Sequence, residues 1–277
     1  MSSDPQSPAA NAHTRTLATE HLPRRLRLDI GYRGTRYAGW ARQRSGRTAG
    51  RPTVQETLED VLATVLGHPV HTIAAGRTDA GVHANAQVVS LDTSARIPAD
   101  GVRRRLEALL PDDIWVLAVT DVDRRFDARR SAVRRWYQYA IWQGTRPEMG
   151  WRGRCLLHPA PLDVHTMRRA AQALLGRHER TSLTGRRAQD ERPSRSLIRT
   201  VYAADWLSFE PAPLLLFQIC ADAFVRQMVR AAVGSLVWVG EGRWTPERFA
   251  EALVARDRRA AGPTAPAHGL TLWKIEY

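Results

Sequence analysis

The sequence predicts an α+β protein built from two similar halves, and three observations support this. Residues 24–32 alternate apolar and charged side chains, as a half-buried strand does. Residues 52–66 place apolar side chains at helical spacing on one face. The same mixture of strands and helices recurs after residue 126. Because consecutive elements usually pack side by side, we expect two abutting, mainly antiparallel sheets with helices on one side.

The first half, residues 24–125, contains strands and helices in an informative order. Its first strand points Leu26, Leu28 and Ile30 to one face. Its first helix, over residues 52–66, begins with the capping pair Thr53 and Glu56. The elements that follow are strands over residues 70–75 and 87–91, a helix over residues 98–110 and a strand over residues 114–119. This β-α-β-β-α-β order is that of a ferredoxin-like (RRM-like) unit.

The second half, residues 126–277, repeats this theme. Strands are expected over residues 135–142, 198–209, 214–220 and 270–277, and helices over residues 162–175, 223–238 and 245–255. The last helix has Thr245 as its cap and Pro246 at its first helical position.

Two segments show no periodicity. Residues 1–23 are predicted to form a disordered tail. Residues 177–195 are polar and rich in arginine, and a flexible basic loop is expected there. Such a loop can be a lid or a ligand contact, although a solvated insertion is the more frequent case.

The chain of 277 residues has 41 Lys and Arg against 28 Asp and Glu, a net charge of +13. This surplus favours a polyanionic partner, because basic side chains that neutralise phosphates release counterions. The basic residues are almost all arginine, and Lys274 is the single lysine. A lone lysine near the C-terminus excludes a GxxxxGK[ST] phosphate loop and argues against Schiff-base catalysis.

Other classes of protein are disfavoured by what the sequence lacks. Cys155 and Cys220 stand in no metal-ligand spacing, so neither a disulfide framework nor a metal site is expected. No apolar run reaches the roughly 18 residues that a membrane span needs. The polar N-terminus lacks the apolar stretch of a secretory signal. We therefore expect a soluble, cytoplasmic protein.

Residues 76–84, Gly-Arg-Thr-Asp-Ala-Gly-Val-His-Ala, lie between two predicted strands. The glycines permit positive φ or a close approach of backbone. Asp79 stands two residues from Arg77, and a guanidinium favours the ionised form of a neighbouring carboxylate. An acid held beside a fixed cation on such a loop is a candidate catalytic site. The alternative is a plain hairpin turn in which Asp79 caps local backbone.

The nine-residue string resembles the catalytic loop of the tRNA pseudouridine synthase A family, which isomerises uridine to pseudouridine in the anticodon arm of tRNA. The resemblance implies that Asp79 is the essential residue and that positions 38 to 40 of tRNA are the targets. It also implies a homodimer and a catalytic cleft between the two halves. No cofactor or metal motif is present, which suits a reaction without a redox step.

Residues 31–43 mix glycine, aromatic and arginine side chains, as a loop that grips nucleic acid does. They also resemble the family's Y-D-G-x-x-Y-x-G-W-x-x-Q segment, although Arg33 takes the place of the acid. Arg36 and Arg42 are therefore candidate substrate contacts. A packed aromatic loop with solvated arginines explains the same residues equally well.

Residues 126–139 resemble the family's F-x-A-R-x-S-A…Y-x-Y pattern. The resemblance places Tyr137 in the active site, and a tyrosine on a sheet face can stack on a base. It also makes Arg129 an RNA-positioning residue, and Arg199 matches an arginine at the start of a later strand of the family. The alternative for Tyr137 is a core side chain.

Arg230 stands among apolar neighbours, where an unpaired charge is costly, so it should reach solvent or pair with an acid. Its segment resembles the family's F-x-x-x-M-V-R-x-x-V-G helix, whose arginine pairs with the catalytic Asp. The resemblance carries that role to Arg230. His83 and His268 are expected to be structural. Arg180 and Leu183 depart from the family's aromatic residues, so packing there is expected to differ.

Two other functions remain open. A non-catalytic RNA-binding protein also uses ferredoxin-like modules, but the RNP1 pattern of such modules is missing. A glycosidase acting on nucleosides needs a second placed acid, for which Asp127 and Asp222 are available.

Overall fold

The computed structural model of the chain describes residues 23–43, 50–185 and 197–277. The predicted tail, apart from residue 23, lies outside the described residues, as do residues 186–195 of the expected basic loop. No helix in the described segments has the length and apolar character needed to cross a membrane.

The first half has the predicted order of elements. They are β1 (Arg24–Tyr32), α1 (Val54–Leu66), β2 (Ile73–Ala74), β3 (His83–Thr93), α2 (Ala99–Leu109) and β4 (Ile114–Val122). A short 3-10 turn, η1 (Gly34–Arg36), follows β1. The strands pair antiparallel, with β1 between β4 and β3 and with β2 on β3, as a ferredoxin-like unit requires.

The second half has the same plan with additions. Its elements are β5 (Arg134–Gln143), β6 (Leu156–His158), α3 (Val164–Ala171), β7 (Gly176–Glu179), β8 (Ile198–Phe209), β9 (Leu214–Ala221), α4 (Met228–Gly240), α5 (Pro246–Val254) and β10 (Leu270–Glu276). The short strands β6 and β7 are not evident from the sequence pattern.

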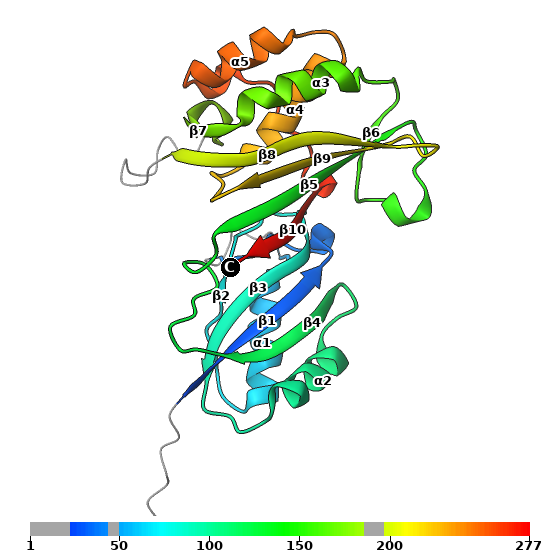
Figure 1. The fold of residues 1–277 in the computed structure, drawn as a ribbon. Helices are drawn as coiled ribbons and strands as arrows, with labels where there is room; N and C mark the ends of the chain where they lie inside the picture. Colours follow the sequence, from blue (N-terminus) through cyan, green and yellow to red (C-terminus); the bar gives the residue numbers. More distant parts are fainter. Residues whose placement is uncertain (1–22, 44–49, 186–196) are drawn as a thin grey trace, which may run out of the picture.

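Within the described residues the two sheets join into one. The strand order is β4-β1-β3-β10-β5-β9-β8-β7, with β2 on β3 and β6 on β5. β10 lies antiparallel to β5 and pairs in parallel with the start of β3, where Thr271 faces His83 and Leu272 faces Ala84. In Figure 1, β10 is the red strand between β5 and β3. The C-terminal strand therefore connects the halves.

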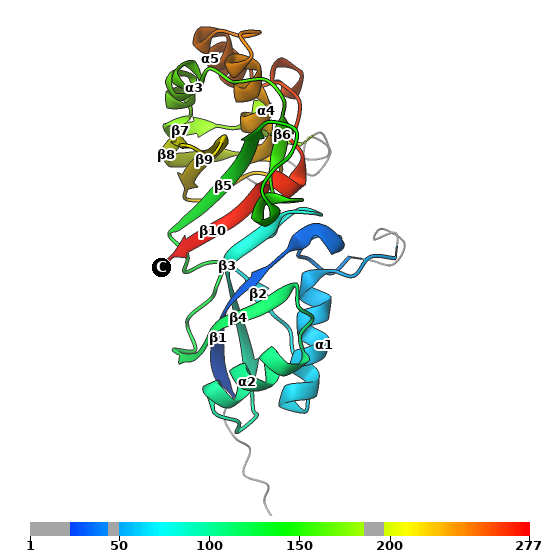
Figure 2. The same ribbon diagram turned by 90° about the vertical axis from the view of Figure 1, so that its right-hand side faces the viewer.

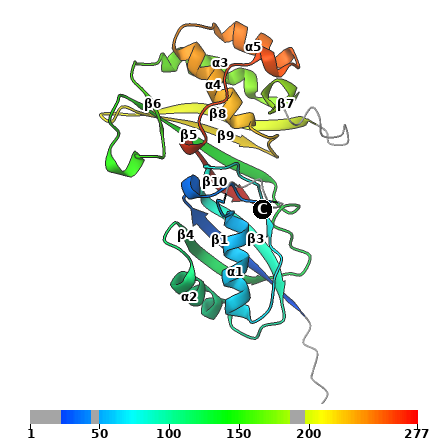
Figure 3. The same ribbon diagram turned by 180° about the vertical axis from the view of Figure 1, so that it is seen from behind.

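The helices gather in two groups, one on each half. Figure 2 shows α3, α4 and α5 at one end of the molecule and α1 and α2 at the other. Seen from behind in Figure 3, α1 and α2 lie in front of β1, β3 and β4. The buried face of α1 includes Leu58 and Leu62, which meet the inward side chains of β1 in the main core. Full burial of each such leucine contributes roughly 1.5–3 kcal/mol.

Local sequence explains the ends of α1. The Thr53 hydroxyl accepts the Glu56 N–H at 3.2 Å, as the predicted cap requires. Gly67 ends the helix at φ 77°, a left-handed conformation that suits glycine. Thr245 caps α5 in the same way through the Arg248 N–H.

Several predicted boundaries were wrong. The strand expected over residues 70–75 is reduced to the two residues of β2, and the strand expected over residues 87–91 is longer, beginning at His83. The helix expected from residue 223 begins at Met228, because Gln227 has φ 63° and interrupts helical geometry. The helix expected over residues 162–175 ends at Ala171 and continues as a 3-10 turn. Residues 176–179 form β7 rather than a loop.

Candidate active site

The loop that carries Asp79 connects β2 to β3, and its base is held by backbone and by a glutamine. The Ala75 N–H donates to the Val88 carbonyl at 2.9 Å. The side chain of Gln87 accepts from Gly76 N at 3.3 Å and donates to Gly76 O at 2.6 Å. Gln87 is fully buried, so these bonds replace the strand pairing that a longer β2 would provide.

Thr78 fixes the middle of the loop to the first half. Its carbonyl accepts the Trp40 N–H at 3.0 Å, and its hydroxyl bonds to the Tyr32 hydroxyl at 2.8 Å. Burial raises the pKa of Tyr32 to about 12, so its phenol stays protonated. Both partners lie on elements packed in the core, which places the residue after Thr78 with little freedom.

Two glycines allow other segments to lie against this loop. A Cβ on Gly39 would stand 2.8 Å from the Thr78 carbonyl oxygen, and Gly39 has φ +101°. A Cβ on Gly34 would stand 1.9 Å from the Val82 carbonyl oxygen. The glycines that the sequence places after β1 are therefore required by close backbone contact with the Asp79 loop.

Asp79 forms an ion pair with Arg230, which comes from the first turn of α4 in the other half. Arg230 Nη1 lies 3.2 Å from Asp79 Oδ2. The Arg230 Nε donates to Ala265 O at 2.7 Å, and Ala265 N donates to Arg230 O at 3.0 Å. The arginine is thus fixed at its backbone and at its guanidinium.

The carboxylate stays accessible in this arrangement. The Asp79 side chain is 31 % exposed, whereas the Arg230 side chain is 15 % exposed. A hydrogen bond between two charged groups orients the carboxylate while one of its sides remains open to a ligand. This acid is therefore held in place by a permanent cation and reachable, as acid–base or nucleophilic chemistry needs.

Tyr137 lies beside the same loop. A Cβ on Gly76 would stand 3.8 Å from the Tyr137 hydroxyl oxygen. The Phe224 ring meets the Tyr137 ring edge to face, with centroids 4.9 Å apart. Burial raises the pKa of Tyr137, and the charge of Asp79 adds to this shift. Tyr137 is only 8 % exposed, so most of its ring packs against protein.

Arg77 does not form the ion pair with Asp79 that the sequence suggests. Its side chain is exposed, and among the described residues the ion-pair partner of Asp79 is Arg230. The cation that meets Asp79 therefore comes from the other half of the molecule.

The remaining candidate arginines differ in exposure and in their partners. Arg36 in η1 is exposed and lies 3.5 Å from Asp113, and Arg42 is half exposed and lies 3.4 Å from Glu59. Arg129 is exposed, and its N–H donates to Asp127 Oδ1 at 2.9 Å. Arg199 at the start of β8 is partly buried; burial lowers its pKa, which the nearby Asp222 partly opposes.

His83 and His268 meet at the junction of β3 and β10. The Gly34 N–H donates to His83 Nδ1 at 3.2 Å, and His83 Nε2 lies 3.1 Å from the His268 carbonyl oxygen. The Nε2 therefore carries the proton. Burial, with the charge of Arg154, lowers the pKa of His83 to about 4, so the ring is neutral and its nitrogens are occupied by backbone. This is a structural histidine.

Both acids that a glycosidase would use are also occupied by backbone. Asp127 Oδ1 accepts the N–H groups of Arg129 and Arg130 at 2.9 and 2.8 Å. Asp222 Oδ1 accepts the N–H groups of Thr200 and Ala223 at 3.1 and 2.6 Å. Asp127 caps a local turn, and Asp222 bonds to its own segment and to β8, which argues against a second catalytic carboxylate.

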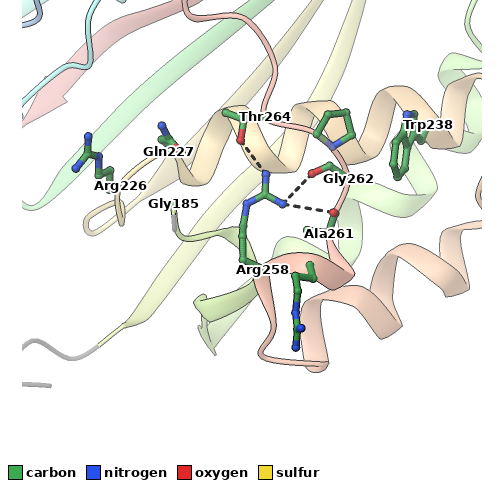
Figure 4. Close-up of a pocket in the computed structure, with 10 residues that line it drawn as sticks. Gly185, Arg226, Gln227, Trp238, Arg258, Ala261, Gly262 and Thr264 are labelled. Carbon is green, nitrogen blue, oxygen red and sulfur yellow. Dashed lines mark hydrogen bonds between the residues drawn. The ribbon is translucent and has the colours of Figure 1, made fainter. Parts of the chain in front are cut away.

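A cavity of about 640 Å³ lies near the start of α4, and Figure 4 shows its lining. Arg258 crosses it and bonds to Gly262 O at 2.9 Å and to Thr264 Oγ1 at 2.8 Å. Neither Asp79 nor Tyr137 lines this cavity. In the described part of the chain, no group of three or more His, Cys, Asp and Glu residues is arranged to hold a metal ion.

Arg135 is a residue of the site that the sequence reasoning missed. It lies on β5 two residues before Tyr137, is 8 % exposed and donates to the carbonyl of Ala75 at the base of the Asp79 loop. The available signal was its position, since Arg135, Tyr137 and Tyr139 alternate along the buried face of one strand. A charged residue in such a series indicates a specific partner.

Known proteins resemble this chain along most of its length. The sequence profile of a family described as tRNA pseudouridine synthase matches residues 30–129 and 170–277. The chain is 39% identical to tRNA pseudouridine synthase A of Exiguobacterium sp. over 254 residues, which is 92% of this chain and 98% of the relative. It is 40% identical to tRNA pseudouridine synthase A of Moorella thermoacetica, over 91% of this chain and 99% of the relative. For tRNA pseudouridine synthase A of Pseudomonas aeruginosa the identity is 41%, over 91% of this chain and 85% of the relative.

These matches span both halves, including the loop that carries Asp79 and the helix that carries Arg230. The chain is therefore a member of the tRNA pseudouridine synthase A family, whose enzymes are isomerases acting on uridine in tRNA.

Proposed function

We propose that this chain converts uridine to pseudouridine at positions 38 to 40 in the anticodon arm of tRNA, with Asp79 as the essential catalytic residue. The supporting observation is the 3.2 Å ion pair between Asp79 and Arg230 on a loop that leaves the carboxylate 31 % exposed. Family membership supplies the reaction class and the tRNA substrate.

The reaction breaks the N1–C1′ bond of uridine, turns the uracil and forms a bond from C5 to C1′. The C5 proton is lost to solvent and N1 gains one, so no redox partner is needed. Asp79 acts either as the nucleophile or as the base at the ribose, and both roles require its ionised form. Arg230 holds one carboxylate oxygen in place.

The target base must leave its stack to reach Asp79, at a cost of a few kcal/mol. We propose Tyr137 as the side chain that contacts the extruded base. Tyr137 exposes only 8 % of its surface, so a base can contact only a small part of the ring. The edge-to-face contact with Phe224 holds the ring in place. The contact is thus narrow and depends on how the Asp79 loop and Phe224 are placed.

The tRNA backbone is proposed to contact arginines around this centre. Arg36, Arg42 and Arg77 lie on exposed segments of the first half, and Arg129 and Arg199 lie on the second half. The net charge of +13 favours such a partner. Arg77, with a side chain free of Asp79, is well placed to meet RNA rather than to tune the acid.

We further propose a homodimer in which one tRNA contacts both subunits, in the cytoplasm where tRNA is modified. Residues 24–125 and 126–277 are proposed as the two domains, joined by the pairing of β10 with β3. Light scattering coupled to gel filtration tests the oligomeric state; a monomer at all concentrations, with and without tRNA, rules out the dimer.

The function is tested with Asp79→Asn, which keeps the size of the side chain and removes its charge. Tritium release from tRNA labelled at C5 of uridine should be abolished, while tRNA binding stays close to that of the wild-type protein. Asp127→Asn is the matched control, because Asp127 caps local backbone and should tolerate the change. Retained turnover in Asp79→Asn contradicts the assignment. Carbodiimide mapping of the product identifies the modified positions.

A further inference from the structure

Arg135 is a buried arginine whose guanidinium meets backbone carbonyl groups instead of a carboxylate. Its Nε and Nη2 donate to Ala75 O at 3.2 and 3.1 Å. Nη2 also donates to Arg129 O at 2.7 Å, and Nη1 donates to Ala132 O at 3.2 Å and to Asp222 O at 2.6 Å. Within the described residues it forms no ion pair. The side chain is 8 % exposed, so these bonds are shielded from water.

The four carbonyl groups belong to three segments that are far apart in the chain. Ala75 is the entry to the Asp79 loop. Arg129 and Ala132 belong to the connection before β5, which also carries a candidate RNA contact. Asp222 begins the segment that leads to Phe224, the neighbour of Tyr137. One guanidinium therefore bonds to three backbone segments next to the proposed base-binding site.

Arginine suits this position for a geometric reason. A guanidinium has five N–H donors in a rigid planar fork, whereas a lysine ammonium is a single point with three donors. A charge taken out of water is tolerated only where its donors are satisfied. A methionine of similar length would leave four carbonyl groups without this partner, and the three segments would separate to find water.

The base of the Asp79 loop is bonded by Gln87 from the first half and by Arg135 from the second half. Gln87 on β3 bonds to both backbone groups of Gly76. Arg135 on β5 bonds to the carbonyl of the preceding residue, Ala75. The base of the loop is thus held from both halves, and Asp79 lies four residues beyond Ala75.

We propose that Arg135 is a positioning residue for the isomerisation: its contacts with three backbone segments place the Asp79 loop against Tyr137 and Phe224. The proposal rests on the proposed function, in which Asp79 carries out the chemistry. It assigns to Arg135 an effect on the chemical step rather than on tRNA binding, because its side chain is enclosed by protein.

Three full-length variants test it: Arg135→Met, Arg135→Lys and the control Arg180→Met. Arg180 is also buried, at 2 % exposure, and also donates to carbonyl groups, those of Leu174 and Gly176, but these lie in the 3-10 turn after α3 and at the start of β7. The measurements are single-turnover tritium release with enzyme in excess, tRNA affinity by filter binding, and thermal unfolding.

In Arg135→Met the single-turnover rate should fall about 100-fold, as a misplacement near 1 Å produces, with tRNA affinity little changed. Arg135→Lys should retain an intermediate rate. Arg180→Met should lower the unfolding temperature but keep the wild-type rate well below that temperature. Hydrogen exchange of the amides of residues 75–82 should speed up in both Arg135 variants and stay unchanged in Arg180→Met.

A wild-type single-turnover rate in Arg135→Met overturns the proposal, as does a rate loss matched by Arg180→Met at equal folded fraction. If Arg135→Met fails to fold, Arg135→Lys decides, and wild-type rate with wild-type exchange overturns the assignment. If the wild-type protein itself releases no tritium, the proposed function fails, and the exchange comparison still tests whether Arg135 holds the loop.

Discussion

Each half of the molecule has a pair of antiparallel strands between its helices, β2 and β3 in the first half and β8 and β9 in the second, and the two pairs differ in the extent of their pairing. In the second half, β8 and β9 form a long ladder that runs from Val201 opposite Ala221 to Phe209 opposite Leu214, with one register shift between Val201 and Ala203. In the first half, β2 pairs with β3 at two positions, Ile73 with Ser90 and Ala74 with Val89. The connection that follows β2 is the Asp79 loop.

Giving up strand pairing in the first half has two consequences. The backbone of the loop loses ladder partners, and its groups are bonded instead by Trp40, Gln87 and Arg135. The start of β3 is left free to pair with β10, which brings the second half beside the loop. A reactive loop and the contact between halves thus arise from the same shortened strand.

The largest expected effect tests whether the second half supplies the essential cation. Arg230→Met removes the partner of Asp79 and should lower the single-turnover rate about 100- to 1,000-fold, the cost of losing one preorganised charged donor. The matched control is Arg226→Met, because Arg226 has an exposed side chain four residues earlier, in the non-helical segment before α4. Equal losses in the two variants would show that general RNA affinity, rather than the ion pair, is at stake.

The next effect concerns the junction between β3 and β10. The pKa of His83 is lowered to about 4, mainly by burial, so between pH 6.5 and 4 the unfolded chain binds a proton that the folded chain does not. The free energy of unfolding should therefore fall as the pH decreases through this range, by on the order of 3 kcal/mol from this group. Urea unfolding at several pH values measures it. In His83→Gln the slope should be shallower, and an unchanged slope would contradict the assignment.

The smallest effect tests the close packing around the loop. Gly39→Ala and Gly67→Ala both place a side chain at positive φ, which costs roughly 1–2 kcal/mol. Only at Gly39 does the new Cβ meet the loop, 2.8 Å from Thr78 O; at Gly67 no heavy atom lies within 4 Å. Gly39→Ala should lose a further ~1–3 kcal/mol in urea unfolding and also lose activity. Equal losses of stability in Gly39→Ala and Gly67→Ala would show that the Asp79 loop moves away from the new Cβ at no cost in free energy.

The elements with strong periodicity were predicted well. α1 and its Thr53 cap, β8 and the C-terminal strand agree with the sequence pattern because each has a continuous apolar face and a local start or stop signal. The start of α4 was wrong because Phe224 and Val225 continue the apolar pattern of the helix while packing from a non-helical segment. The periodicity of apolar side chains indicates which residues are buried, but it does not reveal that the backbone at Gln227 has a positive φ.

For the candidate site, the sequence predicted Asp79 and the family motif predicted Arg230, and the structure brings these two side chains together, but not every neighbour was predicted. Arg77 was assigned to Asp79 because it is close in sequence, and the structure places its side chain in solvent. Arg135 was overlooked because its partners are carbonyl groups, and every residue has one. Since any residue can accept a hydrogen bond through its carbonyl group, the amino-acid type of the partner does not indicate such a contact.

By itself, the sequence determined the order of the main strands and helices, the surplus of positive charge and the presence of one acid on a glycine-bounded loop, since these depend on local pattern and composition. The family motif pointed to Arg230 as the cation of that acid, and only the tertiary structure decided that Arg77 stays away from it and what holds the loop. Both depend on β10 pairing with β3 and on α4 reaching across from the other half. Such contacts join residues 79 and 230, which are 151 positions apart, and they form only when the apolar faces of both halves are buried together.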